Sequence, residues 1–145
     1  MSTGFSFLHI GLNCNDPLAI ERFYTQHFGF QRDRVYAPGD GQVVVIKSGT
    51  LCLELFKAEG KPPFESPGKD GPTWQGLRHF AFLVDNLDDK LAELGDAVKL
   101  TLGPIDFSSF IANHRTAWVS DPEGNIIELN QGYKTEEKPP ALPAQ

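Results

Sequence analysis

The stretch His9-Ile-Gly-Leu-Asn-Cys-Asn-Asp16 recurs later in the chain as His79-Phe-Ala-Phe-Leu-Val-Asp-Asn86. In both copies the histidine precedes a stripe of alternating apolar residues, which is the pattern of a half-buried β-strand. Each copy ends on Asp or Asn, and these residues commonly cap the start of a helix. The repetition therefore predicts two related modules, each with a strand that leads into a helix.

A second match links the ends of the two modules. Residues 48–55 (SGTLCLEL) correspond to residues 123–129 (EGNIIEL), in which Glu54 and Glu128 point away from the main aliphatic stripe of their strands. Each module therefore has the expected order β-α-β-β-β. The expected strands are 5–13, 30–36, 42–47, 50–57, 77–85, 98–102, 115–120 and 126–131, with helices that begin after Asp16 and after Asp85 or Asn86 and end at Gly29 and Gly95.

Composition sets the boundaries of these modules. We expect a first module at residues 1–57 and a second at residues 77–133. Residues 58–76 are rich in proline and glycine, and they are expected to form a connector between the modules. Residues 134–145 are charged and then rich in proline and alanine, and they are expected to be a disordered tail.

Length and charge exclude several classes of partner. The chain has 145 residues, a hydrophobic content of 40% and 11 Phe, which suffices for one hydrophobic core. A net charge of −6 argues against nucleic acid or an anionic membrane as the partner. The sequence has no run of about 20 apolar residues and no visible signal peptide. We therefore expect a cytoplasmic protein that binds a small molecule.

Four polar side chains in the predicted strands form a candidate metal site. They are His9, Glu54, His79 and Glu128. Any one of them alone is expected to be an ordinary residue on a solvated strand face, but the paired recurrence favours a shared site on a curved sheet. Two neutral imidazoles and two carboxylates would hold a divalent ion without net charge, and they suit Ni, Zn, Co, Mn or Fe(II). The sequence therefore predicts a metalloenzyme with one divalent metal ion.

Several motifs in combination resemble the vicinal-oxygen-chelate superfamily, which includes glyoxalases, bleomycin-resistance proteins and extradiol dioxygenases. The motifs are the two His strands, Glu21-Arg-Phe-Tyr24 with His27-Phe-Gly-Phe30, and Asp121-Pro-Glu-Gly-Asn-Ile-Ile-Glu-Leu129. The resemblance covers residues 5–131. It implies an α+β fold in which two βαβββ modules form a cupped mixed sheet around a metal site.

Within this superfamily, the order His-Glu-His-Glu is most similar to glyoxalase I. This similarity implies a lyase or isomerase that acts on a small α-oxo or α-hydroxy carbonyl compound through a metal-bound enediolate. It implies that Glu128 is the catalytic base that moves the proton, with Glu54 as its counterpart. It also implies a homodimer in which one chain supplies the first His–Glu pair and its partner the second, although the connector also permits a site within one chain.

Two other functions stay open. The set His9, His79 and Glu128 resembles the ligands of Fe(II) extradiol ring-cleavage dioxygenases, which generally lack a ligand at the position of Glu54. Alternatively, the chain is a non-catalytic small-molecule binding or resistance protein that has kept the metal ligands.

Five basic side chains are candidates for substrate binding. Arg32 and Arg34 are similar in position to an arginine by which glyoxalase I enzymes bind the carboxylates of glutathione. The chain departs from that pattern after Glu54, where Lys57 follows in place of an asparagine, so the use of glutathione is not implied. Lys57 is either an anion ligand or an exposed edge lysine. His114 and Arg115 precede a strand, and they are either an acid/base and anion anchor or a solvated loop pair.

Overall fold

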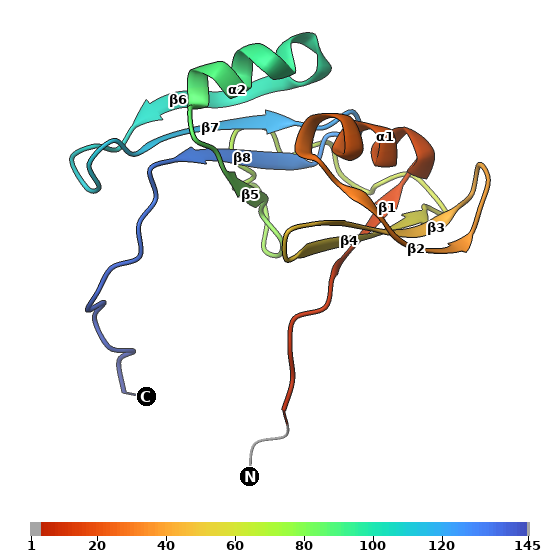
Figure 1. The fold of residues 1–145 in the computed structure, drawn as a ribbon, viewed down its shortest axis with the longest axis horizontal. Helices are drawn as coiled ribbons and strands as arrows, with labels where there is room; N and C mark the ends of the chain where they lie inside the picture. Colours follow the sequence, from red (N-terminus) through yellow and green to blue (C-terminus); the bar gives the residue numbers. More distant parts are fainter. Residues whose placement is uncertain (1–3, 145) are drawn as a thin grey trace. The chain divides into compact units, whose positions relative to one another are not determined.

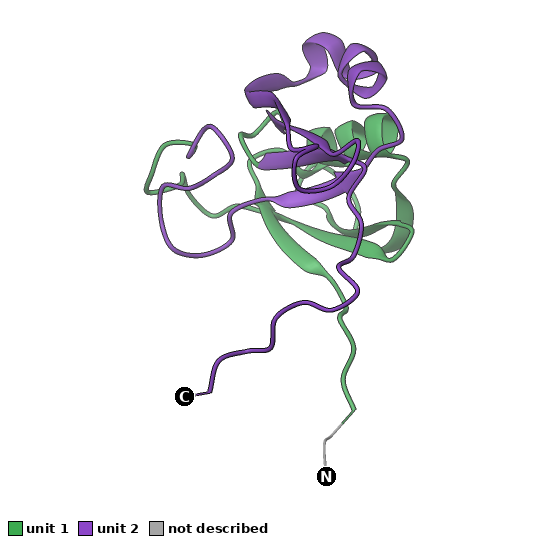
Figure 2. Cartoon of the chain, turned by 90° about the vertical axis from the view of Figure 1, so that its left-hand side faces the viewer, with its two compact units in different colours: residues 1–66, 121–125 green, residues 67–120, 126–145 purple. Residues whose placement is uncertain are grey.

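The computed structural model describes residues 4–144 and divides them into two compact units (Figures 1 and 2). Unit 1 comprises the residues up to Ser66 together with Asp121–Asn125. Unit 2 comprises Pro67–Ser120 together with the residues from Ile126 onward. The expected α+β fold of two βαβββ modules is confirmed, because each unit contains one four-stranded mixed sheet with a helix.

Unit 1 has the strand order β1-β4-β3-β2, in which β1 is parallel to β4 and the other neighbours are antiparallel. Its elements are β1 (Ile10–Cys14), α1 (Pro17–Phe28), β2 (Gln31–Ala37), β3 (Val43–Ser48) and β4 (Leu51–Lys57). Helix α1 begins and ends as predicted, because the Asp16 side chain accepts the Ala19 N–H at 3.0 Å and Gly29 adopts a left-handed φ of 67°.

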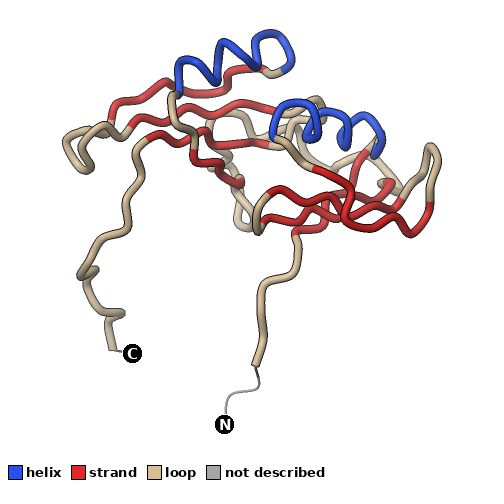
Figure 3. Tube along the Cα trace, in the orientation of Figure 1, coloured by secondary structure: helices blue, strands red, loops and turns tan. Residues whose placement is uncertain are grey.

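Unit 2 repeats this plan of strands and a helix (Figure 3). Its strand order is β5-β8-β7-β6, in which β5 is parallel to β8. Its elements are β5 (Phe80–Leu83), α2 (Leu87–Leu94), the short 3-10 helix η1 (Gly95–Ala97), β6 (Lys99–Asp106), β7 (Arg115–Ser120) and β8 (Ile126–Gln131). The Asn86 side chain caps α2 by accepting the Asp89 N–H at 3.0 Å. Ile127 and Leu129 of β8 are fully buried, as are Leu87 of α2 and Val119 of β7.

The first strand of each unit is shorter than predicted. The predicted strands began at Phe5 and Leu77, whereas β1 begins at Ile10 and β5 at Phe80. Alternation of apolar residues predicts an extended backbone, but a strand also needs a neighbour to pair with. Strands β4 and β8 begin only at Leu51 and Ile126, so the residues that come well before each histidine have no partner strand. His9 and His79 therefore lie immediately before β1 and β5.

Strand β6 is longer than predicted. The prediction ended it at Leu102, but pairing with β7 continues to Asp106 through a shift of register between Leu102 and Ile105. Gly103 makes this bulge possible, because its φ is 87° and a Cβ there would lie 2.9 Å from the Thr116 carbonyl oxygen. Bulges accept Gly and Pro, which otherwise end a strand.

Outside these elements the chain is irregular. The residues between Lys57 and Phe80 are all described and contain neither helix nor strand, and the same holds for residues 134–144. Gln145 of the expected tail lies outside the described residues. Neither α1 nor α2, the helices in the described part of the chain, is long and apolar enough to cross a membrane.

A buried charged network holds α1 against the sheet of unit 1. Glu21 of α1 is 6% exposed, and its carboxylate accepts two hydrogen bonds from the Arg32 guanidinium on β2. Gln42, which is also buried, donates its side-chain amide N–H to Glu21 and accepts from Arg32 at 2.9 Å. The hydrogen bonds from Arg32 lower the pKa of the Glu21 carboxyl below its ordinary value.

We expect Glu21→Gln to destabilise the protein in a pH-dependent manner. Because the pKa of Glu21 is lower in the folded than in the unfolded state, the ionised carboxylate stabilises the fold above its unfolded pKa, and this contribution is lost as pH falls through the folded pKa. Denaturant unfolding should show a loss of about 1.5 kcal/mol at neutral pH, which is kept modest because Arg32 is half exposed. The difference from wild type should shrink in acid.

Glu93→Gln is the matched control. Glu93 pairs with Lys90 at 3.0 Å, but its side chain is 60% exposed, so the change should alter the free energy of unfolding by no more than about 0.5 kcal/mol. Equal, pH-independent losses in both variants would contradict the role assigned to Glu21.

Candidate metal centre

The four predicted ligands form one His–Glu pair in each unit. In unit 1, His9 Nε2 lies 2.7 Å from Glu54 Oε2. In unit 2, His79 Nε2 lies 2.8 Å from Glu128 Oε2. The side chains are between 15% and 32% exposed, so each pair is largely shielded but still reachable from solvent.

Both pairs arise from the same strand register. Across the parallel pair β1·β4, Glu54 is opposite Gly11, and across β5·β8, Glu128 is opposite Ala81. Each histidine precedes that opposite residue by two positions and therefore shares its face of the sheet. Diagonal neighbours of this kind are within reach of long side chains. The sequence repeat is thus also a repeat of geometry.

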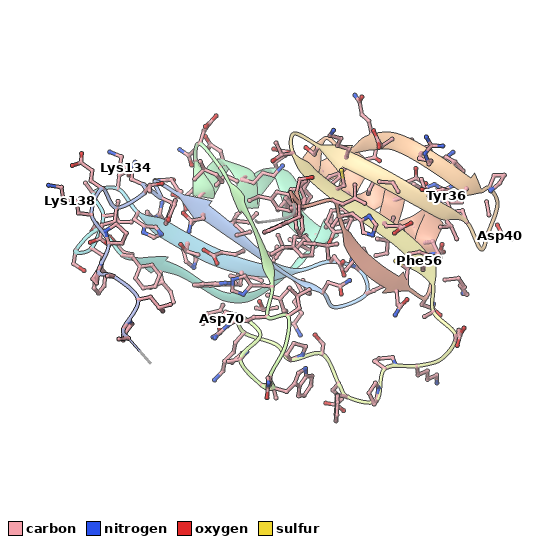
Figure 4. All side chains as sticks on the ribbon, turned by 90° about the horizontal axis from the view of Figure 1, so that it is seen from below. Tyr36, Asp40, Phe56, Asp70, Lys134 and Lys138 are labelled. Atoms are coloured by element: carbon pink, nitrogen blue, oxygen red, sulfur yellow. The ribbon has the colours of Figure 1, made fainter. Side chains whose placement is uncertain are left out.

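The surroundings of the unit 2 pair suit a metal ligand. His79 Nδ1 lies 2.7 Å from the carbonyl oxygen of Asp70, a connector residue labelled in Figure 4. A carbonyl only accepts, so Nδ1 carries a proton and the other ring nitrogen, Nε2, faces a carboxylate. Nε2 is therefore the ring nitrogen that could bind a cation next to Glu128. Metal-binding histidines typically donate their other N–H to such a carbonyl.

The other carboxylate oxygen of Glu128 also has a hydrogen-bond partner. Its Oε1 accepts a hydrogen bond from Asn130 Nδ2 at 2.7 Å. Asn130 follows Glu128 by two positions on β8 and therefore lies on the same face. Sequence reasoning missed this residue, although its position at the second residue after a predicted ligand could have indicated it.

Each unit contributes one pair of donors. Among the described residues, there is no cluster of three or more His, Cys, Asp or Glu side chains arranged to hold a metal ion. The donor types nevertheless fit a divalent metal, since imidazole and carboxylate are its common ligands. The predicted metal site would take all four side chains, two from each pair, and it stays a prediction.

The structure gives each of the five predicted substrate-binding side chains an intramolecular partner, and four of these side chains are basic residues outside the polar face of Glu128. Arg34 lies 5.8 Å from the ring centre of Tyr36, which projects from β2 in Figure 4, and Lys57 donates to a backbone carbonyl. The partners are Glu21 for Arg32, Tyr36 for Arg34, Asn15 for Lys57 and Asp88 for Arg115. Arg115 binds Asp88 through two hydrogen bonds and lowers the pKa of that carboxyl. Anion binding by these residues stays a prediction.

His114, the fifth candidate, belongs to the same polar face as Glu128. Its Nε2 lies 3.2 Å from Thr116 Oγ1 and 3.2 Å from Asn130 Nδ2. Asn130 thus contacts both His114 and Glu128. The structure brings together Glu128, Asn130 and His114 in unit 2, in addition to the pair with His79.

Comparison with known proteins agrees with this geometry. The Glyoxalase/Bleomycin resistance protein/Dioxygenase superfamily matches residues 6–129. The chain is 32% identical to the uncharacterized protein YwkD of Bacillus subtilis over 92 residues, which are 61% of this chain and 69% of that protein. It is 25% identical to a glyoxalase family protein of Enterococcus faecalis of known structure, with a TM-score of 0.66 over 86% of this chain and 96% of the other.

A genomically encoded fosfomycin resistance protein of Listeria monocytogenes shares the fold at 17% identity, with a TM-score of 0.60 over 92% of this chain and 96% of that one. At this identity the likeness concerns the fold alone. The match of the superfamily to most of the chain, together with the repeated βαβββ units, leads to one conclusion: this chain belongs to the glyoxalase/bleomycin resistance protein/dioxygenase superfamily.

Proposed function

We propose that this chain is a metal-dependent lyase or isomerase of the glyoxalase I type. Its substrate would be a small α-oxo or α-hydroxy carbonyl compound, on which it moves a proton between adjacent carbons. The observation that carries this proposal is the His–Glu pair at the same register in both units. A ring-cleavage dioxygenase needs only three protein ligands, which would leave Glu54 and its contact with His9 without a role.

The metal would be held by His9, Glu54, His79 and Glu128. When bound, it would supply positive charge that stabilises an anion developing on two neighbouring substrate oxygens. The chain itself would move the proton. Glu128 is the proposed base, because the Asn130 amide holds Oε1 and thereby directs Oε2. A carboxylate oriented in this way can accept a proton from one carbon and return it to the next.

Loss of either unit 2 ligand should remove the metal. His79→Ala or Glu128→Gln should weaken divalent-metal binding by at least about tenfold, since each takes away a ligand to the ion. The measurement is metal content by mass spectrometry, after dialysis against a defined metal buffer. His27→Ala is the control, because it removes an imidazole from α1 in the other unit. Unchanged metal content in both ligand variants would refute the site.

Shortening the base should slow catalysis more than binding. Glu128→Asp keeps the charge but withdraws the carboxylate by about 1 Å, and kcat should fall roughly a hundredfold because proton transfer needs contact at hydrogen-bond distance. KM should change far less. Glu54→Asp is the matched variant in unit 1, and its kcat should fall less than that of Glu128→Asp.

This comparison needs a substrate, which a screen of α-oxo aldehydes with and without thiols should supply. A metal-loaded Glu128→Asp protein with wild-type kcat would leave Glu128 as a ligand at most. The same screen separates the other functions. Oxygen uptake with catechols by the iron-loaded protein would favour ring cleavage, and tight binding without turnover would favour a sequestering protein.

We also expect a homodimer whose metal sites are shared between chains. Strands β1 and β5 are the edges of their sheets, and the exposed apolar side chains Leu8 and Leu83 lie beside or within them. Light scattering at micromolar concentration should therefore give twice the mass of the chain. A monomer would contradict the expectation.

A mixing experiment tests whether the two pairs come from different chains. His9→Ala and His79→Ala alone should each bind metal at least about tenfold more weakly than the wild type. If sites are shared, each mixed dimer has one intact site out of two. About half of the dimers are mixed after the two variants are refolded together, so about a quarter of wild-type binding should return. Restored binding in the mixture requires shared sites, whereas sites within one chain predict no recovery.

A further inference from the structure

Three buried polar atoms next to the unit 2 His–Glu pair have no hydrogen-bond partner among the described residues. They are His114 Nδ1, Trp118 Nε1 and Asn130 Oδ1. Trp118 is 7% exposed, so water reaches its indole N–H poorly. A buried polar group without a partner is costly and rare in native proteins. Three of them in one place indicate a site that a polar molecule completes.

The strand register places all three residues on one face of unit 2. Across the antiparallel pair β7·β8, Thr116 is opposite Asn130 and Trp118 is opposite Glu128. His114 precedes Thr116 by two positions, immediately before β7, and therefore continues the same face. The Trp118 ring is 6.3 Å from the His79 ring, centre to centre. The unpartnered atoms thus share the face that carries the proposed metal ligands of this unit.

Glu128 determines which of these atoms donate and which accept. A carboxylate only accepts, so the Asn130 amide must present Nδ2 to it, and this leaves Oδ1 as the free acceptor. The second hydrogen of Nδ2 points to His114 Nε2, so Nε2 accepts and the neutral ring carries its proton on Nδ1. The face therefore offers two donors, His114 Nδ1–H and Trp118 Nε1–H, and one acceptor, Asn130 Oδ1.

Aromatic side chains surround the His114 end of this face. The Phe107 ring is 5.6 Å from the His114 ring and the Tyr133 ring is 6.5 Å from it. The Phe110 ring lies 6.4 Å from the Phe107 ring, centre to centre, and Phe110 is 83% exposed. The Phe107 N–H donates to the His114 carbonyl at 2.8 Å, which ties this loop to the start of β7. A ligand at His114 would therefore meet apolar surface.

We infer that this face of unit 2 is a substrate subsite for the hydroxyl group of a neutral, aromatic or apolar α-hydroxy ketone. A hydroxyl has one O–H donor and two acceptor lone pairs, so it can donate to Asn130 Oδ1 and accept from both N–H donors. A carboxylate would be repelled by Asn130 Oδ1 and by the charge of Glu128. The inference rests on the proposed function for what then happens to the molecule, but the binding itself does not require turnover.

Three matched probes test the subsite: α-hydroxyacetophenone, acetophenone, which lacks the hydroxyl, and phenylglyoxylate, which carries a carboxylate. Their dissociation constants for the full chain should be measured by ligand-observed NMR titration. Each titration is repeated with EDTA, so that chelation of a metal by the two oxygens of the hydroxy ketone does not create the preference. The hydroxy ketone should bind at least about tenfold more tightly than either other probe.

Two variants remove one donor each. Trp118→Phe keeps the ring but loses the indole N–H, and His114→Phe keeps an aromatic ring but loses both nitrogens. Each should lower the preference for the hydroxy ketone over acetophenone by at least about threefold, while acetophenone itself binds as before. Trp74→Phe and His27→Phe are the controls, since these residues lie in the connector and in α1. A purely structural defect would weaken the binding of all probes alike.

The outcomes separate the subsite from the proposed function when metal content and turnover are measured on the same preparations. The subsite is overturned if the hydroxy ketone binds no more tightly than the other probes, or if its preference disappears with EDTA. It is also overturned if the preference is equal in wild type and both variants, even when metal and turnover are present. A preference that depends on Trp118 and His114 upholds the subsite, even if the protein binds no metal and turns nothing over.

Discussion

The parallel pairing of the first and last strand of each unit is the constraint on which the candidate site depends. In that pairing, β1 beside β4 and β5 beside β8, a histidine just before one strand comes within hydrogen-bond distance of a glutamate in the middle of the other. A shift of register by one residue would turn each glutamate to the opposite face of its sheet, which carries buried residues such as Leu53, Leu55, Ile127 and Leu129. An unpaired carboxylate there would be strongly destabilising. The cost of burying a glutamate among these apolar side chains therefore favours the register in which histidine and glutamate pair.

Local signals explain why the helix ends and several strands could be predicted. The caps Asp16, Asn86 and Gly29, and the strands 115–120 and 126–131, depend on neighbours in sequence and were found where expected. The starts of β1 and β5 and the end of β6 depend on what a distant strand offers as a partner, and alternation of residues carries no such information. The same distinction applies to the site. Asn130 is two residues from Glu128 on β8, so the sequence could have indicated it, whereas the contact of the Asp70 carbonyl with His79 depends on how the irregular connector folds.

The motif Asp121-Pro-Glu-Gly-Asn125 belongs to unit 1, although the strands on either side of it belong to unit 2. It lies between β7 and β8, yet it packs within unit 1, where the buried Asp121 accepts a hydrogen bond from Tyr24 of α1 at 2.9 Å. Asp121 also accepts from the backbone N–H groups of Glu123 and Asn125. Glu123 in turn accepts the N–H groups of Asn15 and Asp16, just before α1. The carboxylates of Asp121 and Glu123 thus hold the motif to the start and the middle of the α1 region of unit 1.

Cys14, which is fully buried in unit 1, is not a reactive thiol at neutral pH. Burial raises the pKa of the Cys14 thiol to about 12, so at neutral pH it holds its proton and is a poor nucleophile. The carboxylates of the two His–Glu pairs have different surroundings. Among the described residues, the side chains of His9 and Glu54 make polar contacts only with each other. The His79 side chain also contacts the Asp70 carbonyl, and the Glu128 carboxylate also accepts from the Asn130 amide. Two groups in equivalent positions take different roles when their environments differ. The Glu128 carboxylate is held by Asn130, which also contacts His114, so a bound substrate would meet it in a defined orientation. This difference between the two pairs supports Glu128 over Glu54 as the proposed base.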